Sequence, residues 1–315
     1  MSVKKVVKQH NKRDLIVHTP LLQRPQKVII QNYKRQIETT TLINKIKSFI
    51  SSNDSNYYLG FGGLGDALLL LATCWNDPKA KVIFFANQQP FIRQFFDLFN
   101  VQIFLHDNVM GSNLAPQAYN LITKHPNFKQ SAHLADYCNY EDWRNEEKYI
   151  KRIISYVPWI EKLGKKEEET IILSPSGSQK CNHRQRHLSK DEFEKLVNKH
   201  EDIYAIGSLN DIHYYGLIKR KGFHWLNSDK IYHWDESIEK ITIKDMVQII
   251  HSAKQVISMD TWLKTYSLLC GIPTTVIETR WYGQYYPYGG DSTDWVFLNP
   301  KIWKNITFAK ITDLI

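Results

Sequence analysis

Hydrophobic positions in the first third of the chain recur in short apolar runs that alternate with longer amphipathic stretches. Strands are predicted to end at Phe61 and to cover Lys81–Ala86 and Val101–Leu105. Helices are predicted between these strands, from about Asp66 and over Pro90–Phe99. This strand-helix alternation is typical of a parallel sheet with helices on its faces.

A second alternation of the same kind occupies the C-terminal half. It follows a charged helix predicted over Glu141–Leu163 and a polar stretch, residues 164–169, that suits a domain boundary. The predicted elements are, in order, a strand Thr170–Ser174, a helix Ser189–His200, a strand Ile203–Gly207, a helix Ile243–Ser252, a strand Gln255–Met259, a helix Thr261–Cys270 and a strand Thr274–Ile277. Ser189 and Glu192 have the spacing of a capping box. The fold class is therefore predicted as α/β, with two Rossmann-like αβ domains, residues 51–163 and 164–315, facing each other across a cleft.

Residues 1–50 are predicted to form a basic N-terminal arm or extension. Two short β-like stretches, Leu15–Val17 and Val28–Ile30, precede a helix around Thr41–Ser51. The arm has 11 Lys and Arg against 2 Asp and Glu, whereas the rest of the chain has 30 of each, so the arm accounts for the whole net charge of +9. Such an arm is either a solvated tail or a contact for a polyanion, which is nucleic acid or an anionic membrane face.

Composition excludes several other classes of protein. With 43% hydrophobic residues the chain can bury a substantial core. The longest apolar run, Ala67–Trp75, is far shorter than the ~20 residues of a membrane span, and no apolar stretch of a secretory signal follows the basic N-terminus. Because the four cysteines include no CxxC pair, neither a disulfide framework nor a zinc ribbon is indicated. We therefore predict a cytoplasmic protein without a transmembrane segment.

Three glycines, Gly62, Gly63 and Gly65, surround the end of the first predicted strand and precede Asp66. Glycine lets the backbone turn sharply and approach a ligand closely, and Asp66 falls at the cap or in the first turn of the next helix. Asp66 is therefore either a simple helix cap or a functional carboxylate. A dinucleotide site would also require an acidic residue about twenty positions later, where this chain has residues 86–88, Ala-Asn-Gln, so a nicotinamide cofactor is disfavoured.

Two further strand ends carry candidate chemistry. The small residues of Ser174–Ser178 are followed by a cationic cluster, Lys180, His183, Arg184, Arg186 and His187. Backbone N–H groups, hydroxyls and arginine suit a phosphate, although a solvated basic loop has the same composition. At the second strand end, Asp260-Thr261 precedes a predicted helix. These residues either simply cap that helix or lie where its positive N-terminal end faces a ligand.

Together these motifs resemble the glycosyltransferase B fold and, within it, the ADP-heptose:lipopolysaccharide heptosyltransferases of glycosyltransferase family nine. The resemblance covers roughly residues 56–290. Its four parts are "GGLGDALLLLA", "ILSPSGS…RHLSKDEFEKL", "DMVQIIHSAKQVISMDTWLKTYSLLCGIPTTVI" and "RWYGQYYPYG". The resemblance implies that Asp66 is the catalytic base, that Arg186 replaces a phosphate-binding lysine, and that Asn210 and Asp211 lie near an acidic contact to the nucleoside.

The chain departs from this family at the donor site. The family has Gly after Asp-Thr and His three positions further, where this chain has Trp262 and Thr265. Trp262 would fill space in the donor pocket or stack on a different base or sugar, and Lys264 or Arg280 would replace the lost contacts. The sugar and the nucleoside of the donor therefore stay open.

The resemblance implies an inverting, metal-independent hexosyl- or heptosyltransferase that needs no cofactor besides its nucleotide-sugar donor. The first domain would bind the acceptor and the second the donor. The predicted donor-binding residues are Ser176, Gly177, Ser178, Arg186, Asn210, Asp211, Asp260, Thr261, Trp262 and Lys264, and the predicted acceptor or loop residues are Gly62, Gly63, Gly65, Arg280 and Tyr282.

The acceptor is predicted to be anionic, and two classes stay open. One is a lipid-linked surface glycan, reached by peripheral contact of the basic arm with the inner membrane. The other is nucleic acid, as in phage enzymes that glycosylate modified DNA bases in the host cytoplasm. Protein glycosylation is a weaker third hypothesis, and a catalytically silent nucleotide- or partner-binding module on the same fold is the alternative to an enzyme.

Overall fold

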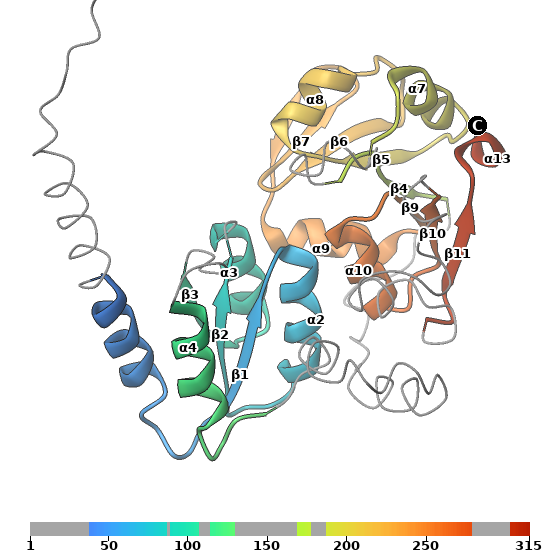
Figure 1. Cartoon of the computed structure of the whole chain (residues 1–315). Coiled ribbons are helices and arrows are strands. Elements are labelled where there is room, and N and C mark those ends of the chain that lie inside the picture. Colours follow the sequence, from blue (N-terminus) through green and yellow to red (C-terminus); the bar gives the residue numbers. More distant parts are fainter. Residues whose placement is uncertain (1–37, 87–88, 107–113, 130–168, 178–186, 279–302) are drawn as a thin grey trace, which may run out of the picture. The chain divides into compact units, whose positions relative to one another are not determined.

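The computed structural model describes most of the chain (Figure 1). The described residues are 38–86, 89–106, 114–129, 169–177, 187–278 and 303–315. Contacts between residues divide the chain into two units, Met1–Ser48 and Phe49–Ile315. The helix predicted around Thr41–Ser51 covers residues 38–49, and Leu42 and Ile46 on it are buried. The short β-like stretches predicted before it lie outside the described residues.

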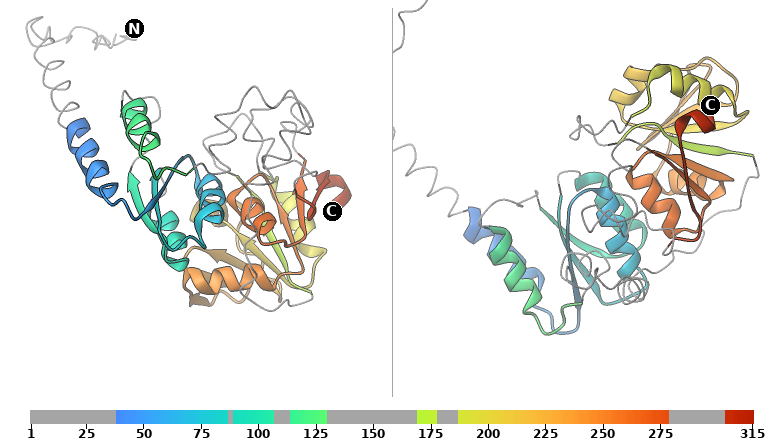
Figure 2. Two further views of the ribbon diagram at one scale, coloured as in Figure 1. Left: turned by 90° about the horizontal axis from the view of Figure 1, so that it is seen from below. Right: turned by 45° about the vertical axis from the view of Figure 1, so that its right-hand side comes forward.

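The first sheet is wholly parallel and has the order β1 (Asn56–Phe61), β2 (Ala80–Phe85), β3 (Gln102–His106). Phe128 adds a parallel bridge to Tyr57, on β1, so the chain returns to pair with its first strand after forming the third. Helices α2 (Leu64–Cys74), α3 (Gln89–Leu98) and α4 (Leu114–Thr123) pack against these strands (Figure 2).

Helix α2 explains the long apolar run of the sequence. Leu68, Leu69, Leu70, Leu71 and Ala72 are all buried, which leaves no polar face along this part of the helix. The helix is covered by β1 and by α10 (Trp262–Leu269), and a helix that is hydrophobic all round is stable only when it is enclosed in this way. The apolar run is therefore a core helix.

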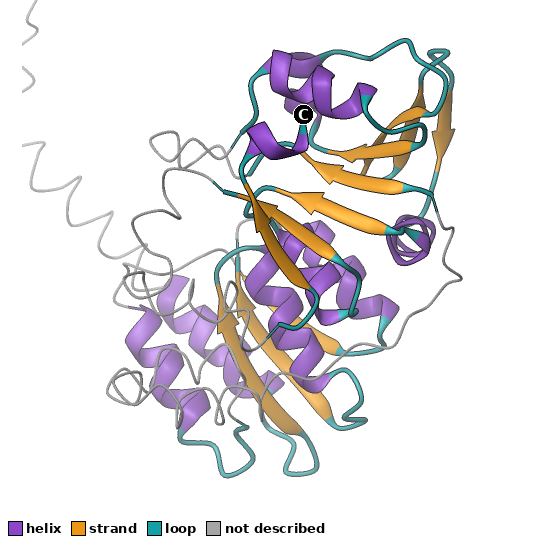
Figure 3. Ribbon diagram, turned by 90° about the vertical axis from the view of Figure 1, so that its right-hand side faces the viewer, coloured by secondary structure: helices purple, strands orange, loops and turns teal. Residues whose placement is uncertain are grey.

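The second sheet has eight strands in the order β11-β10-β9-β4-β5-β6-β7-β8. The bounds of its strands are β4 (Ile171–Ser174), β5 (Ile203–Ile206), β6 (Phe223–Asn227), β7 (Lys230–His233), β8 (Ile238–Lys240), β9 (Gln255–Ser258), β10 (Thr274–Ile277) and β11 (Ile306–Ala309). The six strands β11, β10, β9, β4, β5 and β6 are parallel, and β7 and β8 add an antiparallel extension (Figure 3).

Numbered along the chain, the six parallel strands lie in the order 6-5-4-1-2-3, which is that of a doubly wound nucleotide-binding fold. Along the sequence, β4 is the first strand of this sheet, β5 and β6 follow on one side of it, and β9 then pairs with β4 on the other side. The strand order therefore reverses between β4 and β9. All residues of β4 and of β10 are buried, as expected for strands covered on both faces.

Three helices of this part begin with the same local device. Ser189, Ser208 and Thr242 are the N-caps of α7 (Lys190–Asn198), α8 (Leu209–Tyr215) and α9 (Ile243–Ser252), and each has an acidic side chain three residues on that accepts from the N-cap backbone N–H. The capping box predicted at Ser189 is thus confirmed.

The predicted α/β class is confirmed, as are the strands and helices expected in the described residues. The sequence prediction lacked α4, α8, the strands β6, β7, β8 and β11, and the short helix α13 (Ile311–Leu314). The charged helix predicted over residues 141–163 lies outside the described residues, and the cleft between two domains stays a prediction. Within the described part of the chain, every helix is too short or too polar to span a bilayer.

Candidate nucleotide site

Two of the sequence motifs lie side by side where the strand order of the second sheet reverses. Ser174, the last residue of β4, is in register with Ser258, the last residue of β9. The backbone N–H of Met259 donates to the carbonyl oxygen of Ser174 over 3.0 Å. In open α/β sheets this is the place where ligands bind, beyond the carboxyl ends of the strands. The loops that begin at Pro175 and at Met259 therefore form the candidate ligand site.

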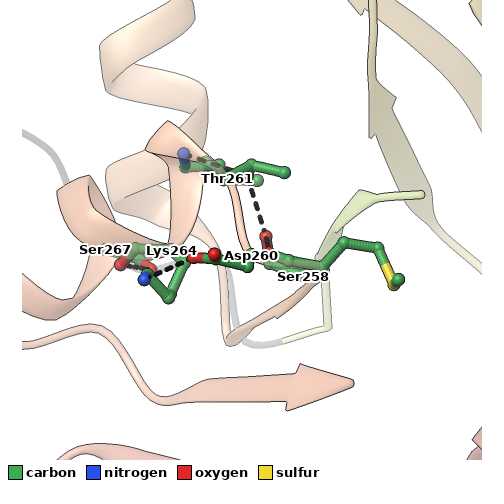
Figure 4. Close-up of polar contacts among 7 residues, drawn as sticks. Ser258, Asp260, Thr261, Lys264 and Ser267 are labelled. Atoms are coloured by element: carbon green, nitrogen blue, oxygen red, sulfur yellow. Dashed lines mark hydrogen bonds and ion pairs between the residues drawn. The ribbon is translucent and has the colours of Figure 1, made fainter. Parts of the chain in front are cut away.

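The loop after β9 is held by short polar contacts at the start of α10 (Figure 4). Thr261 is the N-cap, and its Oγ1 accepts from the backbone N–H of Leu263 over 3.2 Å and lies 3.1 Å from the hydroxyl of Ser258. The ammonium of Lys264 lies 2.6 Å from a carboxylate oxygen of Asp260, and the two side chains are only 3% and 12% exposed. Lys264 is therefore engaged in a buried ion pair with another predicted donor-site residue.

Trp262 and Thr265, the two departures from the family pattern, both serve helix packing. The indole of Trp262 packs against two aromatic rings of α3. Its centroid lies 5.7 Å from that of Phe91 and 5.8 Å from that of Phe95. Thr265 is buried, and a Cβ placed on Gly65 would lie 3.3 Å from its Oγ1. Small residues at positions 65 and 265 thus let α2 and α10 approach closely. This packing role was not anticipated from the sequence.

The glycine-rich motif shows why a carboxylate follows its glycines. Asp66 is half-buried in the first turn of α2, and its Oδ2 accepts from the backbone N–H of Gly63 over 2.7 Å. Gly62 has a φ of +126°, and a Cβ there would lie 2.2 Å from the same oxygen. A Cβ on Gly60 would lie 2.7 Å from Leu70 and from Phe84. Asp66 is therefore a helix cap, whereas its role as a base stays a prediction.

The loop after β4 is tied to α8. The hydroxyl of Ser176 donates to Oδ1 of Asp211, whose Oδ2 accepts from the backbone N–H and the hydroxyl of Ser208 over 2.7 and 2.6 Å. One turn further along α8, the phenolic oxygen of Tyr215 lies 3.2 Å from the carbonyl of Pro175 and 2.9 Å from that of Leu188. Burial and the nearby Asp211 carboxylate raise the pKa of Tyr215 above its ordinary value, so this hydroxyl stays a donor.

Several predicted site residues cannot be placed. Ser178, Arg186, Arg280 and Tyr282 lie outside the described residues, as do the other members of the cationic cluster except His187. His187 is exposed and forms an isolated antiparallel bridge with Ser176, at the start of the loop. Gly177 is half-buried beside Ser176, and Asn210 is exposed in the first turn of α8.

Sequence reasoning missed two residues of the site, Ser208 and Tyr215. The Ser208–Asp211 spacing is that of a capping box and was a usable signal, because the same spacing was used at Ser189. No comparable signal marks Tyr215, because its partners, Pro175 and Leu188, are distant in sequence.

Comparisons of the chain with known protein families, with curated proteins and with solved structures found no match. The fold and the strand ends nevertheless define a class: an α/β protein with a Rossmann-like parallel sheet and a candidate ligand site at its strand-order reversal. Two of the motifs that resemble glycosyltransferases, the small-residue loop after β4 and the Asp-Thr motif after β9, meet at that site, and the glycine-rich motif packs against its helix α10. The fourth motif, residues 280–289, lies outside the described residues.

Proposed function

We propose that the protein is an inverting glycosyltransferase that moves a sugar from a nucleotide-sugar to an acceptor hydroxyl without a metal. One observation carries the proposal. The small-residue loop after β4 and the Asp-Thr motif after β9 occupy adjacent strand ends at the reversal of a sheet with nucleotide-binding order. These are the two motifs that the resemblance assigns to the donor.

The proposed reaction is a single displacement. The acceptor oxygen attacks the anomeric carbon, the bond from that carbon to the diphosphate oxygen breaks, and Asp66 takes the proton of the acceptor hydroxyl. The backbone hydrogen bond from Gly63 orients the Asp66 carboxylate. The close contact between Gly65 and Thr265 supports this role, because it packs the first turn of α2 against α10.

Charge that develops on the leaving diphosphate requires fixed donors. The N-terminus of α10 at Thr261 and the backbone of Ser176 and Gly177 would supply them, together with Arg186 as the sequence predicts. Lys264 would not contact the diphosphate directly, because its ammonium is buried against Asp260. The acceptor is proposed to be a lipid-linked glycan or nucleic acid, bound with the help of the basic arm.

A second candidate function is a catalytically silent module that binds a nucleotide or a partner. It is favoured by the use of Trp262 and Thr265 for packing at the positions where the family has Gly and His. Measurable hydrolysis of any nucleotide-sugar would exclude this module.

A thermal-shift screen tests nucleotide binding directly. The purified chain is heated with ADP-, GDP-, UDP-, CMP- and dTDP-sugars, with NAD as a control. A ligand present at about 100 times its dissociation constant adds about 2.7 kcal/mol to stability and should raise the melting temperature by several degrees. A shift with one sugar nucleotide supports the proposal, and no shift, or a shift with NAD alone, contradicts it.

Replacement of Asp66 then separates the base from the cap. Asp66→Asn keeps an oxygen that can accept from Gly63 but cannot take a proton, so turnover should fall at least ~10²-fold while donor binding is preserved. The matched control is Asp245→Asn, which changes the equivalent capping carboxylate of α9. Turnover that survives in Asp66→Asn as it does in Asp245→Asn would show that Asp66 only caps the helix.

A further inference from the structure

Helix α8 contacts the loop after β4 through two side chains on one face. Asp211 and Tyr215 are four residues apart and so lie on the same side of the helix. Asp211 accepts from the hydroxyl of Ser176, and Tyr215 bonds to the carbonyls of Pro175 and Leu188, the residues where the loop leaves and returns. The backbone N–H of Leu188 also donates to Pro175 over 2.9 Å, which closes the base of the loop.

Both oxygens of the Asp211 carboxylate accept hydrogen bonds from other residues of the protein. Oδ1 accepts from Ser176, and Oδ2 accepts twice from Ser208. The position of Asp211 requires a glycine at residue 207. A Cβ on Gly207 would lie 2.8 Å from Cβ of Asp211 and 2.9 Å from the Trp225 ring. An acidic residue that binds a ribose hydroxyl needs a carboxylate oxygen directed at the ligand. The carboxylate of Asp211 instead links the loop after β4 to the residue that caps α8.

The hydroxyl of Ser176 is also committed. A carboxylate only accepts hydrogen bonds, so the Ser176 hydroxyl must be the donor toward Asp211. Phosphate oxygens are acceptors as well, so this hydroxyl cannot donate to a phosphate while it is bonded to Asp211. At Ser176 and Gly177 a phosphate would therefore be bound by the backbone N–H groups, so the backbone there must hold its conformation.

We infer that α8 braces the loop after β4, and that Asp211 is a positioning residue which holds Ser176 and Gly177 for a nucleoside diphosphate instead of contacting the ribose. This inference rests on the proposed function, since it assumes that the site binds a nucleotide. Its physical basis is preorganisation: Ser176 and Gly177, already held in place by α8, lose less conformational entropy when the ligand binds.

The test measures dissociation constants by calorimetry for wild type, Ser176→Ala, Asp211→Ala and the double variant. The probes are UDP, GDP and ADP, each with its 2′-deoxy form. Without this brace, the binding step must also order about one residue of the loop, and the entropy lost in doing so weakens binding. Each single variant should therefore bind roughly tenfold more weakly. The double variant should be no weaker than either single one, because both remove the same link. The ribose and deoxyribose forms should be affected equally.

Ser176→Ala guards against a folding artefact, because it leaves the Ser208–Asp211 cap intact. Asp245→Ala is the matched control. Asp245 accepts from the backbone N–H and the hydroxyl of Thr242 in the cap of α9, as Asp211 does from Ser208 in the cap of α8. This control should bind each probe as wild type does.

Three results would overturn the inference. A loss in Asp211→Ala that is confined to the ribose forms would make Asp211 a direct ribose ligand. Unchanged or strictly additive dissociation constants would show that Ser176 and Asp211 do not act together. If wild type binds none of the probes, the proposed function and this inference fail together, whereas wild-type binding with unaffected variants refutes the inference alone.

Discussion

The Asp260–Lys264 ion pair allows a quantitative test of whether the start of α10 is buried from solvent. Replacement of Lys264 by Met keeps the aliphatic volume but removes the ammonium that lies against the carboxylate of Asp260, a side chain only 12% exposed. Removal of one partner from a buried pair costs about 3–5 kcal/mol, because an uncompensated charge stays behind. At about 2 °C per kcal/mol for a chain of this size, the melting temperature should fall by about 6–10 °C.

The chain contains a matched pair for comparison. Asp191 and Lys195 on α7 have the same residue types, the same order and the same spacing, with 2.8 Å between the charged atoms, but their side chains are 75% and 56% exposed. Lys195→Met should therefore destabilise the fold far less than Lys264→Met does. Urea unfolding at constant pH, or calorimetry, measures both variants against wild type.

The double variant Asp260→Asn/Lys264→Met completes the test. Because it removes both charges together, it should recover most of the stability that Lys264→Met loses. The reasoning is refuted if Lys264→Met is no more destabilising than Lys195→Met, or if the double variant is as unstable as Lys264→Met alone. Either result would mean that the pair is solvated in solution.

Three further predictions follow from single contacts. Gly62→Ala should destabilise the fold by about 1–3 kcal/mol, because φ is +126° and the new methyl group meets Asp66, whereas Gly63→Ala, at φ −93°, should cost about 1 kcal/mol or less in the same urea titration. Trp262→Ala should cost about 2 kcal/mol, roughly half the value for a fully buried tryptophan, through lost contact with Phe91 and Phe95, and Trp262→Phe should recover part of it. Burial and the neighbouring His233 lower the pKa of His224 below 6.5, so the unfolded chain binds more protons just below that pH, and stability should fall as the solution is acidified through this window.

The His224 prediction is checked by urea unfolding between about pH 7.5 and about pH 5.5 in wild type and in His224→Gln. The variant should show a smaller loss of stability on acidification. His200 also has a lowered pKa, caused by burial and nearby lysines and arginine, and His200→Gln should remove a separate part of the same loss. An unchanged pH dependence in both variants would contradict the assignment.

Local sequence patterns predicted much of the fold correctly. The strands ending at Phe61, Ser174 and Ser258 and the helices that follow them were predicted from apolar periodicity and capping spacing. These signals depend on neighbours a few residues away, so they are readable without tertiary structure. The antiparallel strands β7 and β8 were missed because they are short and mostly polar, and all three residues of β8 are exposed.

The sequence by itself determined which residues stand at the strand ends: glycines with Asp66, small residues with Ser176, and Asp260 with Thr261. Only the tertiary structure decided what these residues bond to. It paired Lys264 with Asp260, packed Trp262 against α3, placed Thr265 against Gly65 and tied Ser176 to Asp211. All but the first of these join residues far apart in the chain, and the first depends on burial. Side-chain partners of this kind are selected by how the helices and strands pack, which no local pattern encodes.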